Sequence, residues 1–184
     1  MTDVPESAVG DVLAFWREAG SERWYTPDAG FDASVRERFL ALWQEAAAGR
    51  LSSWEKSDDG ALALTIVLDQ FPRNMFRGDP RAFSSDTLAR EVARRAIERG
   101  VDQHMEPPLL QFLYLPFMHS EDLSDQMRCV ELFQAGGDPE NLRYAEIHAD
   151  IIRRFGRFPH RNGVLGRITT AEEQAFLDAG GFSG

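Results

Sequence analysis

Residues 61–83 read ALALTIVLDQFPRNMFRGDPRAF, an apolar run that passes directly into a polar segment with several arginines. Asp58 or Asp59 precedes the run and can cap a helix, and the unbroken apolar residues predict that this helix is buried. Pro72 lacks an amide hydrogen and restricts the residue before it, so we expect the helix to end there. Residues 71–83 are then expected to form a polar loop.

Helical spacing of apolar residues continues on both sides of this segment, and no stretch alternates convincingly between polar and apolar residues. Helices are expected to begin at polar residues that can act as N-caps or open a first turn: Asp32, Ser85 or Asp86, Ser120 and Asp138. In the helix after Ser120, Leu123 and Met127 are expected on the buried side. The sequence therefore predicts an all-α fold of about seven or eight helices. Stacked antiparallel hairpins of the tetratricopeptide-like kind are expected, although that repeat's sequence pattern is absent.

The composition is that of a globular protein with 184 residues, a net charge of −10 at pH 7 and one cysteine. One domain over residues 1–184 is expected from the length. An acidic chain lacks the basic surface that nucleic acid or an anionic membrane attracts, so neither is expected as a partner. The start of the chain is acidic and has no apolar core, and Cys129 stands alone, so we expect a cytoplasmic location.

The charge is distributed unevenly along the chain. Residues 143–167 contain six arginines against Glu146 and Asp150, a local charge of +4, whereas the rest of the chain is acidic. The net charge of the whole protein therefore does not predict the charge at the site that we expect near residues 143–167.

Three segments place polar residues among apolar ones, namely residues 68–78, residues 114–126 and residues 154–163. The first contains F-P-R-N and the third F-P-H-R-N, each directly after a predicted helix. A phenylalanine can anchor such a loop, a proline can fix its backbone, and arginine and asparagine can then present donors that converge on an anion. The expected donors are Arg73, Arg77, Arg157, Arg161 and His160.

A structural interpretation of the same residues stands beside this one. Carboxylates in the same segments can pair with the arginines and satisfy helix ends, which would make the polar cluster part of the fold. The carboxylates in question are Asp69, Glu121, Asp122 and Asp125. Both interpretations can hold together.

Two further functions remain open. A hydrolase would use His119 or His160 as a base, Glu121 as its orienting partner and the arginines to stabilise negative charge. A protein-interaction scaffold would instead need an exposed apolar groove. No spacing typical of metal ligands or of a nucleotide-binding loop occurs, so neither a metal nor a cofactor is expected. Whether the protein is an enzyme stays open here, as does its oligomeric state.

Residues 61–83, FLYLPFMHSEDLSDQ (112–126) and IIRRFGRFPHRNGVLGR (151–167) resemble the three signature blocks of an uncharacterised, mainly bacterial family, domain of unknown function 924. The likeness extends over nearly the whole chain. It implies an all-helical, tetratricopeptide-like fold and no established activity. The resemblance marks these site candidates: Asp69, Gln70, Arg73, Asn74, His119, Glu121, Asp125, Gln126, Arg157, His160, Arg161 and Asn162.

Our leading hypothesis is that the three polar segments meet in one cleft. This cleft would bind a small anionic ligand or the acidic end of a peptide, with the donors of the first and third segments around it.

Overall fold

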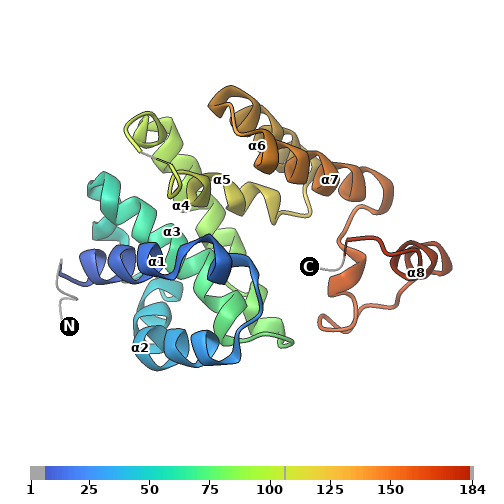
Figure 1. The fold of residues 1–184 in the computed structure, drawn as a ribbon, viewed down its shortest axis with the longest axis horizontal. Helices are drawn as coiled ribbons and strands as arrows, with labels where there is room; N and C mark the ends of the chain where they lie inside the picture. Colours follow the sequence, from blue (N-terminus) through green and yellow to red (C-terminus); the bar gives the residue numbers. More distant parts are fainter. Residues whose placement is uncertain (1–6, 106, 183–184) are drawn as a thin grey trace. The chain divides into compact units, whose positions relative to one another are not determined.

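A computed structural model of the chain describes residues 7–105 and 107–182, which contain eight α-helices and no β-strand (Figure 1). The predicted all-α fold and number of helices are confirmed. The described residues divide into two compact units. The first is built from residues 7–77, 81–105 and 107–116, and the second from residues 78–80 and 117–182. The boundary falls inside helix α5 (Gln111–Met118).

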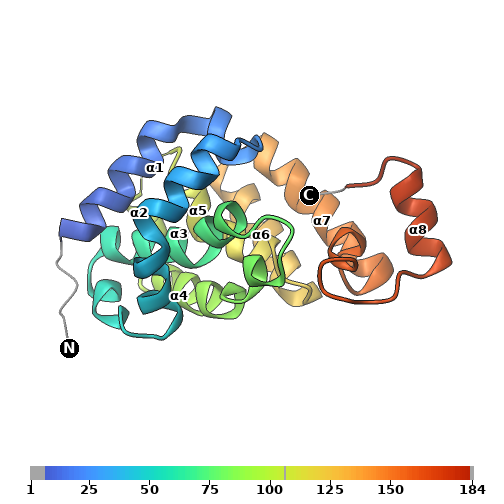
Figure 2. The same ribbon diagram turned by 90° about the horizontal axis from the view of Figure 1, so that it is seen from below.

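The first unit is organised around one buried helix, α3 (Asp58–Met75). Every residue from Gly60 to Pro72 is buried. The short turn η1 (Ser52–Lys56) and three helices pack against α3 (Figure 2). These helices are α1 (Ser7–Tyr25), α2 (Ala29–Ala47) and α4 (Asp86–Glu98). A helix that is apolar on all sides must be covered on all sides, which explains its central place.

Aromatic rings fill the space between α3 and the helices around it. The ring of Phe71 lies 5.7 Å from that of Trp16 and 4.7 Å from that of Phe39, measured between ring centroids. Phe112 lies 5.5 Å from Trp16 on the same scale. Fully burying one such side chain contributes roughly 2 kcal/mol, so this cluster anchors α1, α2 and α5 to α3.

The prediction that Pro72 ends α3 is wrong, because the helix continues to Met75. A proline inside a helix removes the hydrogen bond to the carbonyl four residues earlier, here that of Leu68. The hydroxyl of Ser85 donates to this Leu68 oxygen at 2.6 Å, and the N–H of Phe76 donates to the Pro72 oxygen at 2.9 Å. A partner from another part of the chain thus replaces the lost bond.

The start of α2 also differs from the prediction. Its N-cap is Asp28, not Asp32, and the Asp28 carboxylate accepts hydrogen bonds from the N–H groups of Gly30 and Phe31 at 2.9 and 3.0 Å. Asp32 lies in the first turn, where its carboxylate is available for other partners.

The second unit contains a helical hairpin and a short terminal helix. Helices α6 (Leu123–Gly136) and α7 (Pro139–Phe155) pack against each other, and the turn η4 (Pro159–Arg161) packs against α8 (Ala171–Asp178). Asp138 caps α7 as predicted. None of the helices in the described part of the chain has the length and apolarity needed to span a bilayer.

The beginning of α6 corrects two predictions. The N-cap is Asp122, whose carboxylate accepts from the N–H of Ser124 at 2.7 Å, and not Ser120. Leu123 and Met127 are 39% and 41% exposed rather than buried. The buried face of α6 instead carries Asp125, Gln126, Cys129, Leu132 and Phe133.

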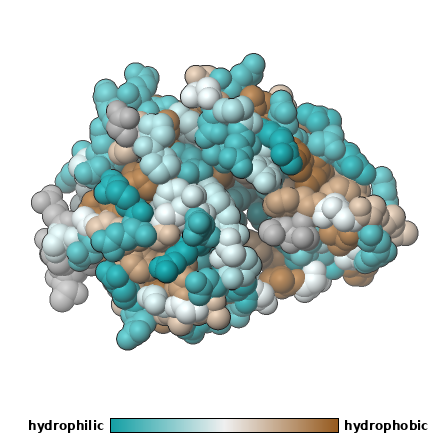
Figure 3. All heavy atoms as spheres, in the orientation of Figure 1, coloured by the Kyte–Doolittle hydropathy of each residue, from teal (hydrophilic) through white to brown (hydrophobic). Residues whose placement is uncertain are grey.

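The apolar core of the second unit gathers around Ile151, Ile152 and Phe158. Phe155, Phe176 and other partly buried residues pack against it. Figure 3 shows hydrophobic residues reaching the surface over the region of α7 and α8. The loop after α7 is thus anchored in this core by Phe158.

We expect Ser85→Ala to lower the free energy of unfolding by about 1–2 kcal/mol, because it leaves the Leu68 carbonyl buried without its hydroxyl donor. Urea unfolding of the full chain measures this. Ser84→Ala is the matched control, because Ser84 is exposed and its hydroxyl donates to the carbonyl of Arg81, three residues earlier. Equal midpoints for the two variants would show that α3 tolerates Pro72 for another reason.

Candidate functional site

Arg73, an expected anion donor, lies in the last turn of α3 and binds carboxylates of its own unit. Its guanidinium makes two hydrogen bonds to Asp86, at 2.8 and 2.9 Å, and one to the Asp69 carbonyl at 2.6 Å. Burial opposes its charge, but Asp86 and Asp69 more than offset this and raise the pKa of Arg73. This arrangement supports the structural interpretation of the first polar segment.

Asn74 and Arg77 share a second carboxylate in the first unit, that of Asp32. Asn74 Nδ2 donates to Asp32 Oδ1 at 2.8 Å, and Arg77 forms a bidentate pair with Asp32 at 2.9 and 3.0 Å. Gln70 Nε2 donates to Asp69 Oδ2 at 2.6 Å. The first segment therefore fastens α2 and α4 to the end of α3.

In the second unit, Glu121 joins the second polar segment to the third. The N–H of Phe158 donates to Glu121 Oε1 at 2.8 Å, and Arg167 donates to both Glu121 oxygens at 2.7 and 3.0 Å. Arg167 also donates to Asn162 Oδ1 at 2.9 Å. Burial opposes the charge of Glu121, but the bonds from Arg167 and Phe158 outweigh it and lower its pKa.

A second carboxylate, that of Glu173, accepts hydrogen bonds from Arg157 and Asn162 in the segment after α7. Only 3% of Glu173 is exposed, and its oxygens accept from Arg157 at 2.6 and 2.8 Å and from Asn162 Nδ2 at 3.1 Å. Thr170 and Glu173 form a capping box at the start of α8. The hydrogen bond from Arg157 is the main reason why the pKa of Glu173 is lowered to about 2.

Asp125 and Gln126 serve the turn between α5 and α6. Ser120 Oγ donates to Asp125 Oδ2 at 2.7 Å. Gln126 Nε2 donates to the carbonyls of Met118 and Ser120 at 2.7 and 2.6 Å. These contacts satisfy carbonyls that the end of α5 leaves without helical partners.

Three histidines and Arg161 gather near Phe158. The Arg161 guanidinium donates to the His119 carbonyl at 3.1 Å and lies 4.5 Å from the centroid of the Phe158 ring. The rings of His148 and His160 lie 5.4 and 5.6 Å from that of Phe158. Only 7% of Arg161 is exposed. We call these four residues, His119, His148, His160 and Arg161, the histidine cluster.

The surroundings keep two histidines of this cluster neutral. Burial is the main cause that lowers the pKa of both His148 and His160 to about 4, and the charge of Arg161 lowers both further. Because His148 Nδ1 lies 2.8 Å from the Tyr144 carbonyl, a neutral His148 carries its proton on Nδ1. His160 Nδ1 is buried and has no hydrogen-bond partner among the described residues.

Metal-ligating side chains and the thiol of Cys129 offer two further kinds of chemistry. Within the described ranges, no group of three or more His, Cys, Asp or Glu side chains is placed to hold a metal ion. Cys129 is buried on α6, and burial raises the pKa of its thiol. A thiol in this environment stays protonated and is a poor nucleophile.

The model of a family of bacterial proteins of unknown function, DUF924, matches residues 12–181. The chain belongs to this family. A solved structure of a protein of unknown function from Agrobacterium tumefaciens is similar to this DUF924 chain, with 44% identity and a TM-score of 0.91. The match covers 94% of the chain described here and 98% of the Agrobacterium chain. The comparison with curated proteins found no match.

In this DUF924 chain residues 117–126 of the second polar segment and the whole third segment lie in the second unit, whereas residues 68–77 of the first segment belong to the first unit. That all three line one cleft stays a prediction. Sequence reasoning missed several partners, namely Asp32, Asp86, Arg167 and Glu173. Asp32 was visible in the sequence only as a helix start. Arg167 was visible as the last residue of a conspicuous block, but its partner Glu121 lies 46 residues away in the sequence, so only the structure pairs them.

Replacing Glu173 by Gln is expected to lower the free energy of unfolding by about 2 kcal/mol, because the buried side chain at this position no longer accepts charged hydrogen bonds from Arg157 with both of its oxygens. Glu172→Gln, at an exposed neighbouring position, is the matched control. Chemical denaturation monitored by circular dichroism measures both. A loss of similar size in the control would contradict the role given to Glu173.

Stability is expected to fall as the pH drops from about 7 to about 5. The lowered pKa values mean that unfolded His148 and His160 take up protons below about pH 6.5, whereas the folded residues do not until about pH 4. Their contribution is therefore complete above pH 6.5 and declines below it. Thermal unfolding at several pH values measures the slope. His148→Gln should flatten it and His104→Gln, at an exposed position, should not; equal slopes would contradict the assignment.

Proposed function

We propose that the protein binds a small anionic ligand, or the acidic end of a peptide, at the histidine cluster of its second unit. The observation that carries this proposal is the buried Nδ1 of His160, which has no hydrogen-bond partner among the described residues and lies close to positive charge.

The electrostatics of this place favour a negative ligand. After burial, the charge of Arg161 is the largest influence on the pKa of His160, and Arg167 acts in the same direction. Glu121 acts in the opposite direction but does not outweigh them. The positive charges of Arg161 and Arg167 are already in place beside His160. A phosphate or carboxylate oxygen that binds near His160 would therefore meet a favourable electrostatic potential.

Hydrogen bonding supports the same ligand class. A buried polar atom without a partner costs about 1–3 kcal/mol, and an anionic oxygen that accepts from a protonated Nδ1 of His160 would remove this cost. The His119 carbonyl and the Phe158 ring hold Arg161 beside this position. Such preorganised donors bind an anion without first paying the cost of ordering side chains.

Binding is favoured over hydrolysis by two observations. An imidazole with a pKa of about 4, as in His160, is a weak base at neutral pH. Glu121, expected as the orienting partner of a catalytic histidine, uses its oxygens to accept from Arg167 and from the Phe158 backbone. Both observations favour a site that binds an anion over a site that hydrolyses a substrate.

Sulfate, added at constant ionic strength, is expected to shift the imidazole NMR signals of His160 saturably and to raise the pKa of this histidine. The rise follows from linkage, because a ligand that binds the protonated form better must raise its pKa; one unit corresponds to a tenfold difference in affinity. Proton–carbon spectra of the full chain measure both effects.

Arg161→Gln should weaken sulfate binding about tenfold or more, whereas Arg128→Gln, at an exposed position on α6, should leave it unchanged. Arg73→Ala tests whether the first polar segment takes part in sulfate binding. No saturable shift of His160 in the wild-type protein would refute the proposal without reference to any variant.

A further inference from the structure

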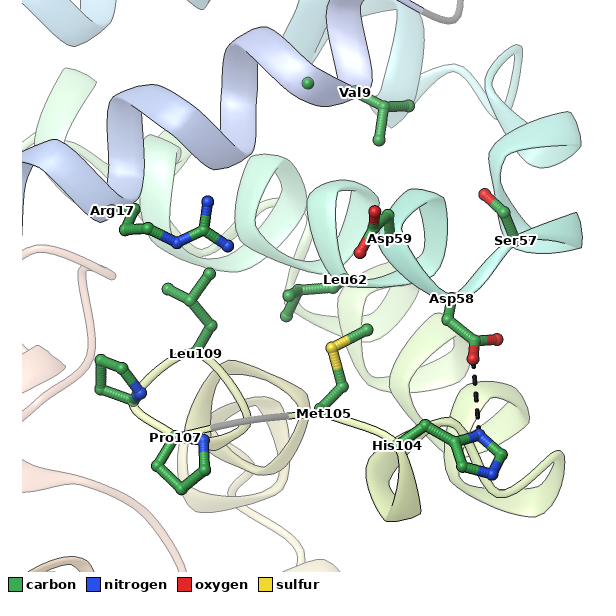
Figure 4. A pocket seen from close by; sticks show the side chains of 12 residues that line it. Val9, Arg17, Ser57, Asp58, Asp59, Leu62, His104, Met105, Pro107 and Leu109 are labelled. Carbon is green, nitrogen blue, oxygen red and sulfur yellow. Dashed lines mark ion pairs between the residues drawn. The ribbon is translucent and has the colours of Figure 1, made fainter.

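The first unit contains a cavity that no part of the proposed anion site uses. It has a volume of about 890 Å³ and lies between α1, the beginning of α3 and the segment that carries His104 and Leu109 (Figure 4). Ligand cavities commonly measure about 300–1,000 Å³, so its size suits a small organic molecule or a short peptide.

The cavity is elongated along α1. Val9 and Arg17 both line it and stand eight residues apart on this helix. At about 1.5 Å of rise per residue, this face of α1 extends for roughly 12 Å. An extended peptide advances about 3.3–3.6 Å per residue, so roughly three residues match this length.

The two ends of the cavity carry opposite charges. Figure 4 shows Arg17 at one end, with Asp59 and Asp58 toward the other. The described residues provide neither Arg17 nor Asp59 with an ion pair or a hydrogen bond. Asp58, by contrast, lies 3.5 Å from Arg99 and 3.6 Å from His104. Among the described residues, Arg17 and Asp59 are thus a donor and an acceptor without a partner.

Apolar side chains line the stretch between these charges. Leu62 of α3, Met105 and Leu109 face the cavity between Arg17 and Asp59 (Figure 4). Leu62 and Leu109 are buried, so this part of the wall is packed firmly, and a methionine beside them adapts to different apolar shapes. The pattern along the cavity is therefore positive, apolar and negative.

We propose that this cavity binds a short peptide of about three residues with free termini. The peptide's carboxylate pairs with Arg17, its ammonium group pairs with Asp59, and a central apolar side chain packs on Leu62, Met105 and Leu109. A guanidinium and a carboxylate at opposite ends recognise a zwitterion by charge complementarity at each end. The site is independent of the anion site proposed for the second unit.

Calorimetric titration of the full chain with the tripeptide Ala-Leu-Ala tests this inference. The unmodified tripeptide is expected to bind saturably. Its N-acetylated and C-amidated forms are each expected to bind about tenfold more weakly, because each loses one charge-assisted contact. No saturable binding of the unmodified tripeptide, or equal binding of all three forms, would overturn the proposal.

Two variants assign the ends of the peptide. Arg17→Gln should abolish the preference for the free carboxylate over the amide and keep the preference for the free amine. Asp59→Asn should do the reverse. Arg161→Gln is the control that separates this site from the anion site and should leave tripeptide binding unchanged. Retention of both preferences in Arg17→Gln and Asp59→Asn would overturn the assignment.

A third variant fills the cavity without disturbing the fold. Gly10 lines the cavity, and a Cβ added there meets no heavy atom within 4 Å. Gly10→Leu should weaken tripeptide binding about tenfold or more while thermal stability stays the same or rises, because leucine favours the helix more than glycine does. Undiminished binding to this variant would place the peptide elsewhere and overturn the proposal.

Discussion

The hydrogen bond from Ser85 to the Leu68 carbonyl allows α3 to continue through Pro72, and the arrangement of the first unit depends on it. With the helix extended to Met75, Arg73 lies one turn after Asp69 and reaches Asp86 at the start of α4. The polar end of α3 thereby becomes a junction between helices. A loop at this place would have left the same donors free for a ligand.

The two segments F-P-R-N and F-P-H-R-N show how context separates similar sequences. Before the second, Gly156 adopts φ of 68° and ends α7, so Phe158 starts a new turn. At the equivalent position two residues before Phe71 stands Asp69, and the buried helix continues through it. A residue free to adopt a left-handed conformation therefore decides whether the shared motif ends a helix or extends it.

Four arginines hold the structure of this protein together. Arg73, Arg77, Arg157 and Arg167 form paired hydrogen bonds with carboxylates and hold helices and loops in place. Their planar donors suit this role, because two parallel bonds fix orientation as well as distance. The structural interpretation of the polar segments accounts for these four. The proposed anion and peptide sites use two other arginines, Arg161 and Arg17.

Local signals in the sequence determined the all-α fold and several helix ends. Asp138 and Thr170 with Glu173 cap helices through backbone groups a few residues away, so their roles follow from neighbouring sequence. The local charge of +4 over residues 143–167 is also a property of the sequence, and it is the reason why an anion site is expected near the loop after α7.

Only the tertiary structure decided the roles that depend on distant partners. Pro72 is tolerated because of a hydroxyl donated by Ser85, and Asp32 serves Asn74 and Arg77 instead of capping a helix. Both contacts join residues that are far apart in the sequence. Apolar spacing reports which face of a helix is buried, but it does not report which donor meets which acceptor once helices pack, because that depends on three-dimensional distances.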